Sequence, residues 1–179
     1  MPQYRRSRQK GGTYFFTLAL ADRRSTLLTA HIDLFKQAYR RVWRERPFES
    51  VAVCVLPDHL HAVWALPEND GDFSLRWQLI KRYFSHHFEV AESRSESKRR
   101  HREKGIWQRR FWEHQIRDEA DLIRCVDYVH FNPVKHGYVR YCKDWEYSTF
   151  HRYVKSGVLP QDWGGTDEMV RRMSLEEWD

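Results

Sequence analysis

The chain has 179 residues, of which 41% are hydrophobic and 31% are charged, and its formal net charge is +6. This length and composition favour one compact core over two domains. The positive charge fits a nucleic-acid partner. No segment is apolar for long enough to span a membrane or to serve as a secretory signal, so we expect a cytoplasmic protein that does not bind membranes.

The first twelve residues form a basic arm that ends at Gly11-Gly12 and carries its cations at Arg5, Arg6, Arg8 and Lys10. Such an arm is either a solvated tail or a segment that grips DNA phosphates. After it, residues 13–20 have the β-branched and aromatic composition of a first strand. Residues 31–45 carry apolar side chains at helical spacing, which predicts an amphipathic helix packed on a sheet.

A β-hairpin is predicted around the turn dipeptide Pro57-Asp58. The preceding run Val51–Leu56 is continuously apolar and suits a buried strand, and a further strand starts at His59. Because side chains alternate between the faces of a strand, His59 and His61 point to the same side and are able to share one metal ion. A His-x-His pair also occurs as an ordinary polar strand face. The adjacent buried strand places this pair on a central, rigid element.

A second helix is expected from Ser74, with an aromatic stripe that either belongs to the core or offers a base-stacking surface. Its other face carries Arg82, a candidate DNA contact. Residues 91–104 are rich in Ser, Arg, Lys and Glu and lack apolar periodicity, which predicts a mobile, solvated connector.

Residues 106–116 alternate large and polar side chains, which predicts a fourth strand with Arg109 and Arg110 near its start. Interleaved Arg and Trp suit single-stranded nucleic acid, because bases stack on indole while guanidinium groups hold the backbone. They suit an ordinary amphipathic edge strand equally well, and both interpretations stay open on the sequence alone.

The last predicted helix begins at Asp118, whose side chain is able to cap it. On this helix Tyr128 and Asn132 stand four residues apart and so lie on one face, which pairs a phenol with an amide. Pro133 should end or kink the helix just after Asn132, unless the chain continues to a stop at Gly137.

The remaining polar residues and the cysteines indicate a specific function less clearly. Lys135 is expected to contact a phosphate, while the positions of His130 and His136 give no reason for metal ligation. The cysteines have the spacing of neither a zinc site nor a disulfide framework, so we expect reduced packing residues at Cys54, Cys125 and Cys142. Residues 144–153 are predicted to form an aromatic-rich segment that docks on the core.

The expected elements follow the order strand, helix, strand, strand, helix, strand, helix. With hairpin-linked strands, this order predicts an α+β fold, a ferredoxin-like antiparallel sheet with helices packed on one face. We expect a single domain over residues 1–179, with the basic arm at 1–12, a catalytic core at 13–153 and a C-terminal tail at 154–179.

Three motifs carry a resemblance to a known family: Pro57-Asp58-His59-Leu60-His61, Phe111-Trp112-Glu113, and the segment from Tyr128 to Gly137. In this order they resemble the REP-associated tyrosine transposases, relatives of the small single-strand insertion-sequence transposases among the HUH endonucleases. The resemblance spans residues 4–153, and its Tyr-x-His-x-Asn-Pro-Val segment is more specific than the His-x-His pair. It implies the same ferredoxin-like fold.

The resemblance further implies a metal-dependent enzyme that cleaves and rejoins single-stranded DNA at repetitive extragenic palindromes. In such an enzyme, Tyr128 would attack the phosphorus and form a 5′-phosphotyrosine intermediate. The metal, Mg²⁺ or Mn²⁺, would be ligated by His59, His61 and Asn132, and imidazole ligands suit Mn²⁺ better than Mg²⁺. No nucleotide cofactor is needed, because the freed 3′-hydroxyl can later reverse the reaction on another strand.

The expected partner is single-stranded or hairpin DNA, held by the cations Arg5, Arg6, Arg8, Lys10, Arg82, Arg109, Arg110 and Lys135. We expect a monomer, with a homodimer as the alternative. A second function also fits the sequence, namely a non-catalytic protein that binds DNA hairpins in a regulatory or structural role. The tyrosine together with three candidate ligands favours the enzyme, because a pure binder has no evident need of all four.

Overall fold

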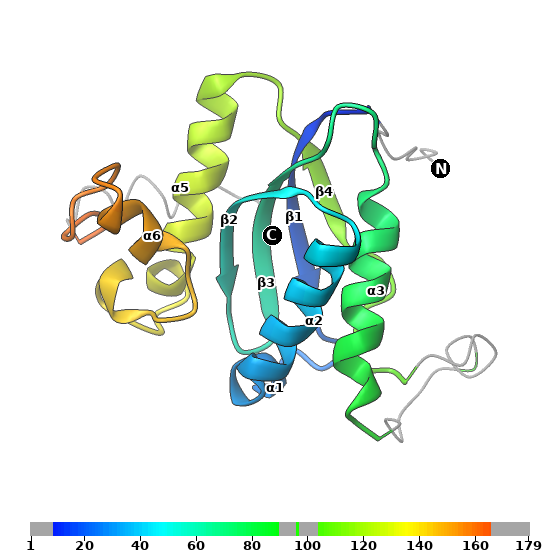
Figure 1. Ribbon diagram of the computed structural model, residues 1–179. Coiled ribbons are helices and arrows are strands. Elements are labelled where there is room, and N and C mark those ends of the chain that lie inside the picture. Colours follow the sequence, from blue (N-terminus) through cyan, green and yellow to red (C-terminus); the bar gives the residue numbers. More distant parts are fainter. Residues whose placement is uncertain (1–8, 90–95, 97–103, 166–179) are drawn as a thin grey trace, which may run out of the picture.

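Four strands form one antiparallel sheet in the computed structural model, which describes residues 9–89, 96 and 104–165 (Figure 1). The strands stand in the order β2-β3-β1-β4, with bounds β1 Thr13–Ala19, β2 Glu49–Val55, β3 His59–Ala65 and β4 Trp112–Gln115. The inner strands β1 and β3 pair from Thr13 opposite Ala65 to Ala19 opposite His59. The predicted hairpin is confirmed as the connection between β2 and β3.

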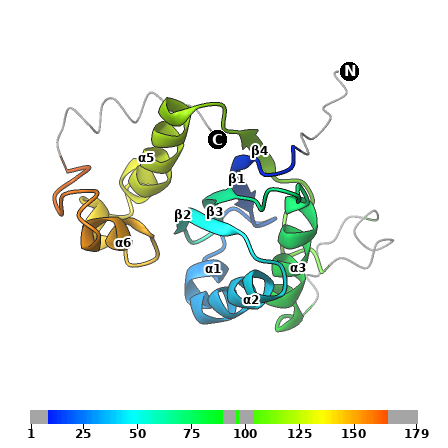
Figure 2. The ribbon, with the colours of Figure 1, turned by 45° about the horizontal axis from the view of Figure 1, so that its top comes forward.

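Helices lie on both faces of this sheet. In the described part of the chain they are α1 Leu27–Ala30, α2 Ile32–Glu45, α3 Phe73–His86, α5 Glu119–Lys135 and α6 Phe150–Lys155, with a short 3-10 helix at Cys142–Asp144. Figure 2 shows α2 and α3 on one face and α5 on the other. The order of elements and strands confirms the predicted α+β, ferredoxin-like class, and α2 and α3 pack on one face as expected. Helix α5 covers the second face in addition.

Two hydrophobic clusters lie on opposite faces of the sheet, because successive side chains of a strand point to opposite faces. On the α2–α3 face, Trp64 of β3 stacks on Trp77 of α3 with 3.9 Å between the ring centroids. On the other face, Phe15 and Val63 pack with residues of α5. The two histidines of β3 stand at the same alternate positions as Val63, so they point toward α5.

Helix α5 runs through Pro133 and stops at Gly137. Gly137 has a φ of 70°, and its amide bonds to the Val134 carbonyl at 3.0 Å, while the next amide bonds to the Pro133 carbonyl at 2.9 Å. This is a Schellman motif, which a glycine in the left-handed conformation permits. Of the two predicted helix ends, continuation to Gly137 is confirmed.

Residues 144–153 dock on the core as predicted, with Phe150 buried in a hydrophobic cluster and Trp145 and Tyr153 packed against that cluster, and they also cover the outer edge of β2. The Thr149 amide donates to the Val53 carbonyl at 2.8 Å, and the Thr149 hydroxyl lies 3.0 Å from Nε2 of His130 on α5. Burial lowers the pKa of His130 to about 3, so its ring is neutral. The segment therefore ties α5 to the sheet and closes part of an edge strand.

The fourth strand is shorter than predicted. The sequence indicated a strand over residues 106–116, but β4 has four residues. Trp107 is buried in the core and forms only an isolated bridge beyond the end of β1, and the chain leaves the sheet between this bridge and β4. Arg109 and Arg110 consequently lie on an exposed loop. The alternation of large and polar residues that predicted a longer strand continues through this loop, because the large side chains of the loop also pack on the core.

The structure also bears on the expectations for membrane helices, the cysteines and the connector. Within the described residues, no helix is both long and apolar enough to cross a membrane. The cysteines are buried and unbridged, which agrees with the predicted packing role of Cys54, Cys125 and Cys142. Most of the predicted connector at 91–104 and the tail beyond residue 165 lie outside the described residues.

A buried carboxylate fixes the start of α5 to β4. Asp121 accepts hydrogen bonds from His114 Nε2 at 2.8 Å, the Arg117 amide at 3.1 Å and Arg124 Nη2 at 3.2 Å. Its own amide donates to the side chain of Asp118, the predicted N-cap, at 2.8 Å. Burial opposes the ionisation of Asp121, but these hydrogen bonds outweigh it and lower its pKa to about 2.

Replacing Asp121 with Asn should destabilise the fold at neutral pH by about 2–3 kcal/mol, because the folded pKa of about 2 compares with about 3.9 in an unfolded chain. Since folding lowers this pKa, the stabilisation is complete above about pH 4 and is lost as the pH falls from about 4 to about 2. Urea unfolding across this range measures the difference between the wild type and the variant.

The matched control is Glu68→Gln, which neutralises an exposed carboxylate in the loop after β3. The control should leave stability almost unchanged at every pH. A stability deficit of Asp121→Asn that stays constant between neutral pH and pH 3 would contradict the ionic role of this side chain.

Candidate metal and tyrosine site

Two buried histidines on β3 form the base of the site. His59 and His61 are 1% and 0% exposed, and their ring centroids are 5.1 Å apart. Both point toward α5, as the alternation of strand side chains requires. They offer two imidazole nitrogens to the space between β3 and α5.

Each of these histidines is held by a contact at Nδ1. His59 Nδ1 lies 2.7 Å from one carboxylate oxygen of Asp58, whose other oxygen lies 2.7 Å from Arg23 Nε. His61 Nδ1 lies 2.9 Å from the hydroxyl of Thr17 on β1. These contacts orient the rings, so a metal ion would be bound through Nε2 of both. The Asp58 carboxylate also makes the His59 ring more basic, which strengthens metal binding.

His136 completes a cluster of three histidines. Its ring centroid is 4.9 Å from that of His59, and one ligand nitrogen from each of His59, His61 and His136 lies within 4.8 Å of the others. The sequence analysis gave His136 no reason for metal ligation, and the path of α5 corrects this. Because the helix continues through Pro133, His136 stands eight residues after Tyr128 and shares its face. The spacing alone would have shown this if the helix had been expected to continue.

Asn132 lies one turn before His136 on the same face and is fully buried. Neither its side-chain oxygen nor its nitrogen has a hydrogen-bond partner among the described residues. A buried polar group without a partner costs roughly 1–3 kcal/mol. A metal ion or its bound water would satisfy this amide, so the donor set of two imidazoles, an amide oxygen and a third imidazole fits a divalent cation.

Tyr128 faces the histidines from α5 and is 1% exposed. Its ring centroid lies 5.3 Å from that of His61 in an edge-to-face arrangement. Lys135 Nζ donates a hydrogen bond to the Tyr128 hydroxyl at 3.0 Å and lies 4.6 Å from the ring centroid. Sequence reasoning assigned Lys135 only to a DNA phosphate, whereas this ammonium group is placed to stabilise negative charge on the tyrosine oxygen.

The other predicted DNA contacts are spread over the molecule. Four of these cations are exposed, namely Lys10, Arg82, Arg109 and Arg110. The other three, Arg5, Arg6 and Arg8, lie outside the described residues. Arg82 is on α3, which lies across the sheet from α5, the helix that carries Tyr128 (Figure 2). Arg109 and Arg110 precede β4, whose first residue pairs with Thr17, so they lie toward the sheet end that carries the histidines. Lys10 precedes β1 at the opposite end.

A second group of potential ligands has a structural role. His114, Asp121 and Cys125 place one ligand atom each within 4.8 Å of one another. However, the Asp121 carboxylate already binds the guanidinium groups of Arg117 and Arg124 at 3.4 and 3.2 Å. A cation would be repelled by these charges, so we interpret the group as the anchor of α5.

Fold and site together define an α+β protein whose sheet carries two clustered histidines opposite a helix-borne tyrosine. No family model matches the chain. Two curated relatives, from Haemophilus influenzae and Escherichia coli K12, are both 48% identical to it, over 94% and 92% of this chain and 97% and 92% of their own lengths. Both are named as REP-associated tyrosine transposases.

A solved structure agrees with these relatives. It is that of a REP-associated tyrosine transposase bound to a REP hairpin, with a TM-score of 0.80, 48% identity, and coverage of 93% of this chain and 94% of that one. The chain belongs to the REP-associated tyrosine transposase family. The resemblance that the sequence motifs carried is thereby confirmed.

Replacing Asp58 with Asn should weaken the binding of Mn²⁺ by about 10- to 100-fold, because His59 would lose the carboxylate that orients it and raises its basicity. Titration of Mn²⁺ followed by calorimetry measures the affinity. The control is Asp22→Asn, which removes an exposed carboxylate paired with Arg24 a short distance along the chain. Equal affinities for both variants would contradict the role of Asp58.

Proposed function

We propose that this chain is a metal-dependent single-strand DNA transposase of the cytoplasm that cleaves and rejoins DNA at REP hairpins through a 5′-phosphotyrosine intermediate. The observation that carries the proposal is the placement of Tyr128 against the histidine cluster, 5.3 Å from His61 between ring centroids. Support for the DNA substrate comes from the 48% identical family member whose solved structure holds a REP hairpin.

The tyrosine supplies the nucleophile. A free phenol has a pKa near 10 and is a weak nucleophile at neutral pH. The hydrogen bond from Lys135 Nζ stabilises the phenolate and so helps the Tyr128 oxygen to attack the phosphorus. The phosphorus–oxygen bond to the 3′ oxygen breaks, and this oxygen takes up a proton from solvent in place of the one that the phenol has lost to solvent, which leaves a 5′-phosphotyrosine and a free 3′-hydroxyl. A 3′-hydroxyl attacking the phosphotyrosine restores a phosphodiester, so no nucleotide cofactor is required.

The residues that would hold Mg²⁺ or Mn²⁺ are His59 and His61 through Nε2, and Asn132 through its amide oxygen, with His136 as a further ligand. A bound ion would supply positive charge to a non-bridging phosphate oxygen and so favour in-line attack by the tyrosine. Imidazole ligands favour Mn²⁺ over Mg²⁺. Asp58 and Thr17 orient the two imidazoles of β3 for this task.

The site needs no second subunit, because Tyr128 and both histidines of β3 meet within one chain. We therefore propose a monomer as the active species. The burial of Tyr128 is the observation that favours the alternative, a hairpin-binding protein without catalysis. In an enzyme, the scissile phosphate would approach the buried tyrosine past Lys135, which is partly exposed, and His136, which is exposed.

Replacing Tyr128 with Phe should abolish a covalent protein–DNA adduct while it leaves hairpin affinity within about twofold, because the phenyl ring keeps the packing of this buried position. Labelled REP hairpin oligonucleotides with single-stranded flanks are incubated with protein and Mn²⁺, and adducts are separated on denaturing gels. Tight hairpin binding by the wild type without an adduct on either strand would contradict the proposed enzyme and support the alternative, a hairpin-binding protein without catalysis.

Replacing Lys135 with Met should slow adduct formation by about 10- to 100-fold at saturating hairpin, since a hydrogen bond to a charged group contributes roughly 1.5–3 kcal/mol. Lys135→Arg should recover part of this rate, because it keeps the charge. Single-turnover kinetics measure the rate, and filter binding measures the affinity. If Lys135 served only as a phosphate contact, affinity would fall and the saturated rate would stay at the wild-type value.

A further inference from the structure

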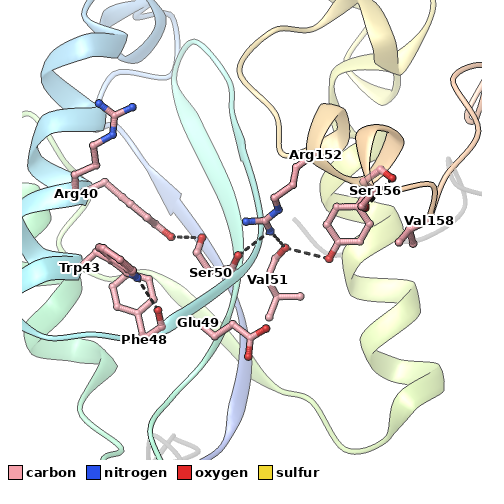
Figure 3. A pocket seen from close by; sticks show the side chains of 11 residues that line it. Arg40, Trp43, Phe48, Glu49, Ser50, Val51, Arg152, Ser156 and Val158 are labelled. Atoms are coloured by element: carbon pink, nitrogen blue, oxygen red, sulfur yellow. Dashed lines mark hydrogen bonds between the residues drawn. The ribbon is translucent and has the colours of Figure 1, made fainter.

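A groove follows the outer edge of the sheet between α2 and the chain around α6 (Figure 3). A cavity of about 730 Å³ lies over the start of β2, and a second of about 240 Å³ lies further along the strand. The two cavities share Tyr39, Arg40 and Ser50 in their linings, so they adjoin along β2 and are together called the groove. Between them the hydroxyl groups of Tyr39 and Ser50 form a hydrogen bond of 2.7 Å from α2 to β2. Nothing in the proposed catalytic chemistry uses this groove.

Cations stand along both walls. Arg40 of α2 lines both cavities, Lys36 lies one turn before it, and Arg152 of α6 stands on the opposite side. Arg152 Nη2 donates to the carbonyls of Ser50 and Val51, which holds its guanidinium group against the edge of β2 (Figure 3). Positive charges are therefore distributed along the groove, and the backbone of β2 fixes the position of one of them, Arg152.

Aromatic side chains accompany these cations. Trp43 is 47% exposed, and its ring is held by a hydrogen bond from Nε1 to the Phe48 carbonyl at 2.9 Å. Tyr153 lines the same cavity, and Tyr147 lines the second one, with Lys36 Nζ 5.7 Å from its ring centroid. Alternating cations and aromatic faces are the features that bind unpaired nucleotides, because phosphates meet the cations and bases stack on the rings.

Two carboxylates, Glu49 and Glu146, also line the groove. They argue against a purely anionic occupant such as a polyphosphate. A carboxylate accepts hydrogen bonds from the amino groups of bases, so this mixture suits a strand that presents both bases and phosphates. Paired bases in a duplex would have neither their faces nor their pairing edges available to these side chains.

A row of rings connects the groove with the histidine cluster. The centroid of the His136 ring lies 6.1 Å from that of Tyr138, which lies 5.5 Å from that of Trp145, and Trp145 lies 5.6 Å from Tyr147. Tyr138 is exposed, and Trp145 and Tyr147 are partly exposed. A strand that leaves the metal site on the His136 side would therefore meet successive aromatic side chains before it enters the groove.

We propose that this groove binds the unpaired DNA strand that flanks the hairpin and leads it to the tyrosine. The inference rests on the proposed function in taking DNA as the substrate, and it adds a binding track outside the catalytic residues. The groove follows β2, whose seven residues span about 20 Å at about 3.3 Å each. This length accommodates about six stacked nucleotides at about 3.4 Å each.

The test compares a REP hairpin without flanks to the same hairpin with a flank of about ten nucleotides on the 5′ or the 3′ side. Affinities are measured by fluorescence anisotropy without metal, at several salt concentrations. One flank should raise wild-type affinity by about tenfold or more, and Arg40→Ala should remove most of that gain and reduce the salt slope by about 0.7. The affinity of the Arg40→Ala variant for the unflanked hairpin should equal that of the wild type.

The matched control is Arg41→Ala, which removes the same charge from the same helix at a position paired with Glu45 at 2.9 Å and outside the groove. Equal gains from the flank for Arg40→Ala and Arg41→Ala, or no gain for the wild type, would overturn the groove proposal. So would a change of oligomeric state in Arg40→Ala by sedimentation, because the groove would then be a protein interface. A flank-dependent gain without any Tyr128 adduct would leave the groove standing and remove only the proposed catalysis.

Discussion

The packing of α5 against the inner strand β3 is the contact on which the candidate site depends. Strand alternation sends His59 and His61 to one face, and α5 closes that face with Tyr128 and Asn132 on its inner side. Removing the helix would leave two buried imidazoles facing solvent and no tyrosine near them. The anchors of α5, Asp121 at its start and the Thr149 contact at its middle, therefore serve the site although they touch none of its ligands.

The end of α5 shows how a local backbone feature extends the donor set. Proline removes an amide donor in the last turn, yet the chain keeps its helical path as far as the left-handed glycine. That path brings Lys135 to the tyrosine hydroxyl and His136 to the histidine pair. A helix that ended at Asn132 would present neither side chain at these positions.

Sequence reasoning reached the parts of this arrangement that follow from short-range periodicity. Periods of 2 and 3.6 residues predicted the shared face of the β3 histidines and the shared face of Tyr128 and Asn132. The turn dipeptide Pro57-Asp58 predicted the hairpin, and the order of the elements predicted the ferredoxin-like fold. Sequence reasoning missed His136 and the tyrosine contact of Lys135, because both depend on whether a proline ends the helix. It also placed the start of β4 too early, since Trp107 packs on the core from a loop that precedes the strand. It missed the placement of α5 on the second face, which only long-range packing decides.

The measurement that tests the central claim most directly is pulsed electron paramagnetic resonance of Mn²⁺ bound to the protein–hairpin complex. Directly coordinated imidazole nitrogens modulate the Mn²⁺ signal, so the method counts histidine ligands without relying on catalysis. The account predicts nitrogen coupling from at least two imidazoles, reduced in His61→Ala and retained in Tyr128→Phe. Mn²⁺ that binds tightly with oxygen ligands alone would contradict a metal centre on β3.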